Sequence, residues 1–449
     1  MERIRRVLQR RSSYEPLEDG SERLLDGEPE EGPHGPAFSW IDYSIFLLLG
    51  VAMLWAWNMF LAAAPYFQRR FESDPSLLRN FQSAILTVST VGNLGSMIVL
   101  TKLQARASYP KRIMASLALN VVIFTLLAMS TRLFLGVSAG TYFGFLMVMV
   151  FSASLATGLC QNGTFAYVSG FGREEYTQGI MTGQGIAGVL PCIAQIVSVL
   201  SVPPRKSEEG APQESSTSAF AYFLTATVVS AIALVAFLFL LSRQQNSQTR
   251  MLHSLDVDDF DTADSSPERK AIPLLRLWRK LSWLATALFL TFAATMLFPV
   301  FTQRILTVRD PASAPRLFQP SSFIPLGFLF WNTGDLIGRV APALPALSLT
   351  SHPRVLHMLS MLRMTFVPLY LLCNLDGKGA IVPSDTFYLF VVQLLFGMSN
   401  GYLGSSCMMG FQEWVDDEER EAAGGFMSLC LVAGLTFGSF ISFSVAGLA

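Results

Sequence analysis

The sequence predicts an all-helical polytopic membrane protein with eleven transmembrane helices. Hydrophobic residues make up 51% of the 449-residue chain, and charged residues only 14%. Soluble domains carry about 25% charged residues, so this deficit indicates segments that face lipid. In addition, apolar runs of about 20 residues, long enough to cross a bilayer as helices, recur along the chain.

Eleven such runs can be read from the sequence. They cover, approximately, residues 43–64, 81–103, 113–134, 142–167, 178–202, 220–241, 281–301, 322–346, 355–373, 387–410 and 425–446. The ninth run is short, and glycines interrupt the fourth and the tenth.

Lysine and arginine placement orients the predicted helices. The loop at 103–112 holds Arg106, Lys111 and Arg112, and the long polar loop at 242–280 is also basic. With an odd number of spans and a cytosolic N-terminus, both loops lie on the cytosolic side, as the positive-inside rule requires. The C-terminus then lies on the luminal or extracellular side.

The chain divides into four predicted parts. Residues 1–38 begin with the basic run MERIRRVLQRR and continue with acidic sequence rich in Pro and Gly, where a signal peptide would have its apolar core. This predicts a disordered cytosolic tail. The N-lobe (39–242) holds helices one to six, and the C-lobe (281–449) holds helices seven to eleven. The Ser- and Asp-rich segment 243–280 is expected to be a flexible cytosolic linker. In the tail, SERLLD loosely resembles an acidic dileucine sorting signal, although a solvated tail is the simpler interpretation.

Composition also excludes several classes of function. A net charge of −1 argues against binding to nucleic acid. The five cysteines are scattered among apolar runs without a CxxC spacing, so we interpret them as packing residues and expect no metal and no cofactor. No P-loop precedes a helix, which excludes direct ATP drive.

The stretch 330–339, FWNTGDLIGR, places a carboxylate and a guanidinium inside the eighth apolar run. Four residues separate Asp335 from Arg339, so on a helix they share one face, with Asn332 a turn earlier. An ionisable residue deep in a bilayer costs roughly 3 kcal/mol on insertion scales and usually faces a cavity or a bundle interior. We therefore expect a polar solute site here; the alternative is a structural ion pair that joins two helices.

Two N-lobe helices carry further polar or aromatic residues in mid-span. In the first, Trp57 lies beside Asn58, with Leu54 and Leu61 a turn either side on the face of Trp57. The indole could pack helices together or form a planar wall for a flat heteroaromatic ring. In the fourth, Gln161 offers both a donor and an acceptor, as the edge of such a ring requires.

The C-lobe offers three more candidates. Phe298-Pro299 predicts a kink in the seventh helix that faces the central path. Arg363 in the ninth helix needs a buried partner, and we expect its role to be mainly structural. His357 is interpreted as a packing histidine rather than a proton relay.

Together these segments resemble the equilibrative nucleoside transporter family, a branch related to the major facilitator architecture. The resemblance runs from the first helix to the C-terminus. It rests on Trp57-Asn58 with Tyr66-Phe67, Tyr176-Thr177 with the run from Met181 to Gly185, Asn332-x-x-Asp335-x-x-Gly338-Arg339, Arg363-x-x-Phe366-x-Pro368 with Cys373-Asn374, and Asn400-Gly401-Tyr402-Leu403 with Ala423-Gly424. The sequence of the first helix, MLWAWNMFLAAAPYF, most resembles that of fungal members.

The resemblance implies a six-plus-five, two-lobe arrangement that carries nucleosides across a lipid bilayer by alternating access. Asp335 and Arg339 would bind the ribose, and Gln161 and Trp57 the base. The cavity and its gates would involve Leu54, Leu61, Phe298, Pro299, Phe328, Asn332 and Leu435. Ala56 stands where many members have proline, and Leu61 where some have methionine, which leaves detailed selectivity and inhibitor sensitivity open.

Several alternatives remain open from the sequence. We expect facilitated flow of nucleosides down a gradient, with nucleobases as further candidate substrates and a proton-coupled symporter as the alternative. A transporter for sugars or polyols, in which Asp335 binds other groups, is a further alternative. A membrane enzyme is not expected, because no His–Asp–Ser cluster or HExxH pattern is present. The expected location is an intracellular membrane of the vacuolar type, with the plasma membrane as the alternative, and the expected working unit is a monomer.

Overall fold

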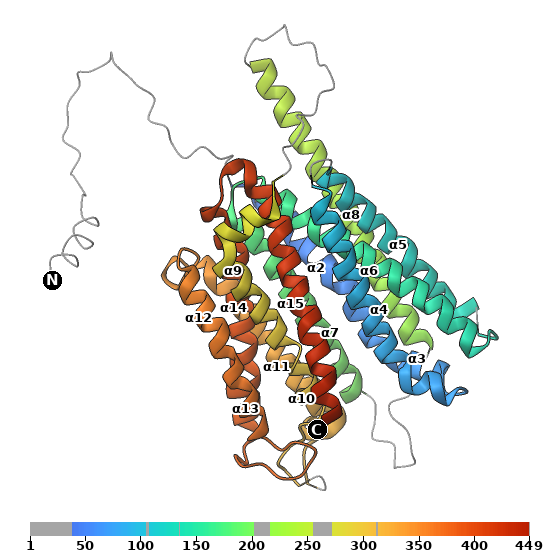
Figure 1. Ribbon diagram of the computed structural model, residues 1–449. Coiled ribbons are helices and arrows are strands. Elements are labelled where there is room, and N and C mark those ends of the chain that lie inside the picture. The colour runs from blue at the N-terminus through green and yellow to red at the C-terminus, as the bar shows by residue number, and fades with distance from the viewer. Residues whose placement is uncertain are drawn as a thin grey trace, which may run out of the picture. The chain divides into compact units, whose positions relative to one another are not determined.

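The computed structural model describes residues 38–104, 107–133, 135–201, 216–254, 272–310 and 313–448. This part of the chain is helical, and its only β-type pairing is an isolated antiparallel bridge between Ile305 and Leu375. Figure 1 shows the helices in chain order, from blue α2 to red α15. The dileucine-like segment, nearly all of the expected tail and the middle of the expected linker lie outside the described residues.

Residues of the expected N-lobe form seven described helices. These are α2 (Trp40–Ala62), α3 (Ala64–Arg70), α4 (Pro75–Lys102), α5 (Tyr109–Leu133), α6 (Ala139–Ser169), α7 (Glu174–Ser201) and α8 (Ser216–Ser254). The start of α4 shows the local logic: the Asp74 side chain accepts hydrogen bonds from the N–H groups of Ser76 and Leu77, while Pro75 needs no partner in the first turn.

Residues of the expected C-lobe form α-helices joined by short 3₁₀ and π segments. The α-helices are α9 (Leu274–Thr295), α10 (Phe298–Thr302), α11 (Pro320–Val340), α12 (Pro353–Leu362), α13 (Phe366–Leu371), α14 (Leu395–Gly410) and α15 (Arg420–Leu448). The 3₁₀ turns are η2 (Arg316–Phe318), η3 (Ala341–Ala343), η4 (Pro345–Leu347), η5 (Arg363–Thr365), η7 (Phe411–Trp414) and η8 (Asp417–Glu419), and η6 (Phe387–Leu394) is a π-helix leading into α14.

Nine helices of the described part are long and apolar enough to cross a membrane. The eighth expected span forms α11, but Asn332, Asp335 and Arg339 lower its hydropathy. The ninth is divided into α12, η5 and α13, each too short to span alone. The all-helical, multi-pass class is thus confirmed, while the count of eleven stays a prediction.

Prolines account for both breaks in the C-lobe helices. The expected kink at Phe298-Pro299 is confirmed: α9 ends at Thr295, and α10 starts at Phe298. Pro299 has no N–H to donate to the carbonyl four residues earlier, so the α-helical ladder stops there. In the ninth span, Pro368 has the same effect, and the preceding turn tightens into η5.

The two ends of the expected linker are helical. α8 continues past residue 242 to Ser254, through a stretch that contains good helix formers such as Gln, Arg, Met and Leu. α9 already begins at Leu274. We call the end of the bundle from which α8 leaves and to which α9 returns the linker end, and the other the far end.

Ion pairs gather at the linker end. The Nζ of Lys280 on α9 lies 2.6 Å from the Glu419 carboxylate and 2.8 Å from that of Asp416. The bond from Lys280 lowers the pKa of Asp416, which lies between the spanning segments. Arg243 on α8 pairs with Asp42 on α2 at 3.2 Å.

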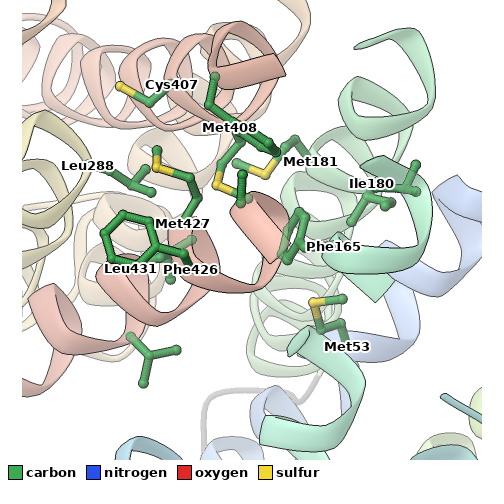
Figure 2. Close-up of a cluster of buried hydrophobic side chains, with 14 of the residues drawn as sticks. Met53, Phe165, Ile180, Met181, Leu288, Cys407, Met408, Phe426, Met427 and Leu431 are labelled. Atoms are coloured by element: carbon green, nitrogen blue, oxygen red, sulfur yellow. The ribbon is translucent and has the colours of Figure 1, made fainter. Parts of the chain in front are cut away.

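One hydrophobic core joins the two lobes at the linker end. Figure 2 shows Met53, Phe165 and Met181 from N-lobe helices in one cluster with Met408 and Phe426 from the C-lobe. Toward the far end the buried apolar residues separate into two cores. One contains N-lobe residues alone, and the other contains C-lobe residues together with Ile196 of α7. The lobes therefore share an extensive core at the linker end, whereas at the far end Ile196 is the one buried apolar residue of the described chain that joins the core of the other lobe.

Candidate functional site

The Asp335–Arg339 pair lies on α11, inside the protein. Each residue is 4% exposed, and the Nε of Arg339 donates to the Oδ2 of Asp335 at 2.6 Å. This is the contact that the four-residue spacing predicted. Burial removes both groups from water, so each needs further partners for its remaining hydrogen-bonding capacity.

Asn400 of α14 supplies the second partner of the carboxylate. Its Nδ2 donates to the Oδ1 of Asp335 at 2.6 Å. The two helices approach this closely because Gly401 faces the α11 backbone, where a Cβ would collide with the carbonyl oxygen of Asp335. Asn400 lies in the family-like motif Asn400-Gly401-Tyr402-Leu403, but no role in the site was predicted for it.

Helix α7 of the N-lobe holds the guanidinium. The Nη1 of Arg339 donates to the Oε1 of Gln184 at 2.9 Å and to the carbonyl oxygen of Met181 at 3.2 Å. Gln184 is itself 4% exposed, and its Nε2 contacts the sulfur of Met53 on α2 at 3.0 Å. The charged pair of the C-lobe is therefore bonded across the junction between the lobes. Gln184 lies in the family-like run from Met181 to Gly185, but no role in the site was predicted for it.

Asn332 extends the same face of α11 by one turn. Its Nδ2 donates to the carbonyl oxygen of Phe328 at 2.9 Å and contacts the sulfur of Cys192 on α7 at 3.5 Å. Gly188 of α7 makes room for it, because a Cβ there would collide with the Oδ1 of Asn332. Asn332 and Arg339 thus both contact α7, and Asp335 lies between them on the same face of α11.

Comparison with known proteins identifies the family. Residues 146–446 match the family model described as nucleoside transporter. The chain is 30% identical over 442 residues to nucleoside transporter FUN26 of Saccharomyces cerevisiae, across 90% of this chain and 83% of the yeast protein. This chain belongs to the nucleoside transporter family. Human equilibrative nucleoside transporter 2 is 26% identical over 459 residues, across 89% of this chain and 95% of the human protein.

The fold of this family member resembles that of solved transporters. FucP, a Major Facilitator Superfamily transporter solved in the outward conformation, superposes with a TM-score of 0.57. The match covers 91% of this chain and 90% of FucP at 17% sequence identity, so it supports the fold alone. The major-facilitator-like class predicted from the sequence is confirmed.

The two expected base-binding residues of this nucleoside transporter lie in the N-lobe. Trp57 is half-buried on α2 and lines a small cavity of about 20 Å³ together with Phe60, Phe124 and Thr157. Gln161 on α6 is 5% exposed, and its Oε1 accepts a long bond of 3.5 Å from Asn93. Among the described residues, no hydrogen bond joins either of them to Asp335 or Arg339.

The neighbours of Trp57 on α2 differ in their surroundings. The Nδ2 of Asn58 donates to the carbonyl oxygen of Ala187 at 2.7 Å and so ties α2 to α7, which is the helix-packing role considered for this pair of residues. Leu54 is half-buried, whereas Leu61 is 55% exposed. The expected gate residue is therefore at the protein surface in this structure.

The expected cavity residues of the C-lobe fall into two groups. The ring of Phe298 stacks on Trp331 with 4.1 Å between centroids and meets Phe328 edge-on at 5.1 Å. Pro299 is half-buried beside them at the start of α10. Leu435 on α15 instead packs against the core that the lobes share. The structure brings Phe298, Pro299 and Phe328 together and leaves Leu435 apart.

Arg363 and His357 make the contacts that their structural interpretation requires. Arg363 is 2% exposed, donates to the Oγ of Ser399 at 2.9 Å and lies over the ring of Phe396. The Nδ1 of His357 is 3.0 Å from the Oγ1 of Thr286, and its ring meets Trp283 edge-on. The five cysteines are unpaired, and the described residues contain no cluster of His, Cys, Asp and Glu able to hold a metal.

Proposed function

We propose that this protein carries nucleosides down their concentration gradients by alternating access, through a site centred on Asp335 and Arg339. The observation that carries the proposal is a charged pair buried at the junction of the lobes, in a chain of the nucleoside transporter family. The relatives named equilibrative favour facilitated flow over proton coupling.

The unused bonding capacity of the pair supports a role in binding ribose. An ionised carboxylate has about four lone-pair sites, and two of those of Asp335 are taken by Arg339 and Asn400. None of the described residues accepts a bond from the Nη2 of Arg339. A vicinal diol offers two O–H donors and two acceptor oxygens, which match a carboxylate and a guanidinium that lie side by side.

Energetics argue against a purely structural ion pair. Replacing a buried ion pair by apolar side chains of similar volume is often neutral, or stabilising by about 1–4 kcal/mol, so burial of Asp335 and Arg339 is poor evidence for a stability role. A pair that bridges two lobes and keeps free donors and acceptors is better suited to exchange bonds with a solute.

Gln161 supports recognition of the base. The residue is 5% exposed, its Oε1 accepts a long bond from Asn93, and none of the described residues accepts a bond from its Nε2. We expect Gln161→Ala to weaken nucleoside uptake by about 1–3 kcal/mol of binding free energy while sparing free ribose. Equal losses for uridine and ribose would contradict this assignment.

The packing suggests the state that the structure represents. A core shared at the linker end and divided at the far end is expected of a carrier closed on the linker side. Arg112, Arg243, Arg276 and Lys280 lie at the linker end, which supports a cytosolic assignment for it and for the N-terminus. We place the protein in an intracellular, vacuolar-type membrane, where it works as a monomer with a luminal C-terminus.

Uptake by purified protein in liposomes tests the proposal. Labelled uridine should enter until internal and external concentrations match, with adenosine competing better than adenine or ribose. An imposed pH gradient should leave the final level unchanged. Accumulation above the external concentration under an acid-outside gradient would support the proton-coupled alternative, and strong competition by adenine would extend the substrates to nucleobases.

A further inference from the structure

Arg363 is a buried cation whose bonds lead toward the site. It lies on η5, and among the described residues no carboxylate is bonded to its guanidinium. Its Nε donates to Ser399, its Nη1 to the carbonyl oxygen of Thr291, and its Nη2 to the Oγ1 of Thr295 at 3.4 Å. Two of these three hydrogen bonds therefore act on a single turn of α9.

These two bonds direct the hydroxyl proton of Thr295. The hydroxyl has one proton and two acceptors within reach: the carbonyl oxygen of Thr291 at 2.8 Å and the Oδ1 of Asn400 at 2.6 Å. Arg363 already donates to the Thr291 carbonyl, which makes that oxygen a poorer acceptor for a second proton. It also occupies a lone pair of the Thr295 oxygen. The proton is thereby steered to Asn400.

A donor at the Oδ1 of Asn400 fixes which edge of the amide faces the site. With Oδ1 turned to Thr295, Nδ2 is turned to Asp335 and donates to its Oδ1 at 2.6 Å. The reversed amide would place an oxygen against a carboxylate oxygen, with no proton between them. Asp335 is then held from two sides, by Arg339 and by Asn400, in one orientation.

We propose that Arg363 is a positioning residue for the recognition of sugar hydroxyls, acting on Asp335 through Thr295 and Asn400. This inference rests on the proposed function of Asp335 as the ribose-binding group. We call the hydrogen-bond chain from Arg363 through Thr295 and Asn400 to Asp335 the relay. It fixes the direction of the remaining lone pairs of the carboxylate, and a site built to bond hydroxyls rejects analogues that lack them. The relay therefore sets the preference for ribonucleosides over 2′,3′-dideoxynucleosides.

Thr295→Val tests the relay, because it keeps the shape of the side chain and removes its hydroxyl. In liposomes we would measure the KM and the maximal rate for uridine and for 2′,3′-dideoxyuridine. We expect Thr295→Val to raise the KM for uridine about tenfold, which is the effect of losing one bond between a sugar hydroxyl and the charged Asp335. The KM for dideoxyuridine should not change. Thr295→Ser restores the hydroxyl and should restore the preference.

Two matched controls isolate the relay. Ser399→Ala removes the one bond of Arg363 that points away from Thr295, and it should keep the preference for uridine. Thr286→Val makes the same change on the same helix, where the hydroxyl bonds the carbonyl of Ser282 and lies 3.0 Å from the Nδ1 of His357, outside the Thr295–Asn400 contact. It should leave the preference for uridine unchanged. Thr295→Ala is a second, smaller variant that tests the relay if valine at this position prevents folding.

The outcomes separate the relay from the site. A wild-type protein that takes up uridine and dideoxyuridine with equal KM would overturn both ribose binding at Asp335 and the relay. A wild type that prefers uridine, with Thr295→Val or Thr295→Ala keeping that preference, would overturn the relay alone. Equal losses for both substrates without rescue by Thr295→Ser would likewise show a merely structural Thr295.

Discussion

Replacing Asp335 by asparagine tests the charged pair with the smallest change of shape. The carboxylate accepts two bonds, each 2.6 Å long, from Arg339 and from Asn400. An amide has only one oxygen, so one of its edges must present N–H groups to another donor. In the free energy of unfolding, losing one bond to a charged group costs about 1.5–3 kcal/mol. Leaving the buried Arg339 without its counter-ion brings the total to about 3–5 kcal/mol.

We expect Asp335→Asn to raise the KM for uridine at least about tenfold, since each 1.4 kcal/mol of lost binding is a factor of ten. Uptake into liposomes, normalised to folded protein from size-exclusion chromatography, measures the effect. The control is Asp385→Asn, the same change at a carboxylate 8% exposed and paired with Arg309 away from the site. The control should lower thermal stability and keep the KM. Normal uridine KM in Asp335→Asn would refute the role of this carboxylate.

Three further predictions concern the frame of the site. Gln184→Leu removes the side-chain acceptor for the Nη1 of Arg339, so uridine transport should fall by the equivalent of about 1.5–3 kcal/mol; unchanged transport would show that the Met181 carbonyl suffices. Gly401→Ala should drive α14 from α11 and cost about 1–3 kcal/mol in thermal unfolding, whereas Gly144→Ala on α6, where a Cβ meets open space, should be near neutral. Arg304, bonded to Asp376 at 2.6 Å, lowers the pKa of that carboxyl in the loop before η6. Its stabilising effect is therefore present above the ordinary Asp value of about 3.9 and is lost as the pH falls through the lower folded pKa. The N–H of Gly379 donates to the side chain of Asn374 in this loop, so its hydrogen-exchange rate reports on the order of the loop. In the wild type this rate, divided by the intrinsic rate at each pH, should rise as the pH falls. In Asp376→Asn the ratio should not change with pH.

The sequence predicted the features that follow from local spacing. A four-residue separation placed Asp335 and Arg339 in contact, and Pro299 predicted the break between α9 and α10. Both follow from helix geometry, which needs no knowledge of neighbouring helices. The helical continuation of α8 to Ser254 was missed, because a polar, Ser-containing stretch was interpreted as flexible despite its helix-forming residues.

Partners that come from distant segments were not predictable in this way. Gln184 lies 155 positions from Arg339, and Asn400 lies 65 positions from Asp335. Their polar side chains lie in glycine-containing runs, which signal close helix packing but not which helix is approached. The role of Thr295 could not be predicted for another reason. A threonine in an apolar helix usually bonds a backbone carbonyl of its own helix, and the bond from Thr295 to Asn400 depends on the tertiary fold.

The position of the site at the junction of the lobes bears on how binding and rocking are coupled. Arg339 belongs to α11 of the C-lobe, whereas both of its α7 acceptors belong to the N-lobe. α7 also contacts C-lobe residues at the far end, where Arg316 donates to the carbonyl oxygens of Val199 and Leu200. Helices that stay in contact along their length are better placed to act as the pivot of the lobe movement than as a gate that opens. A solute can shift the balance between two states only through unequal contacts with them. On the proposed function, bonds to Asp335 and Arg339 at the pivot would change little as the lobes rock. The unequal contacts would then come from the expected base-binding and cavity residues, of which Trp57 lies on α2 of the N-lobe and Phe298 on α10 of the C-lobe.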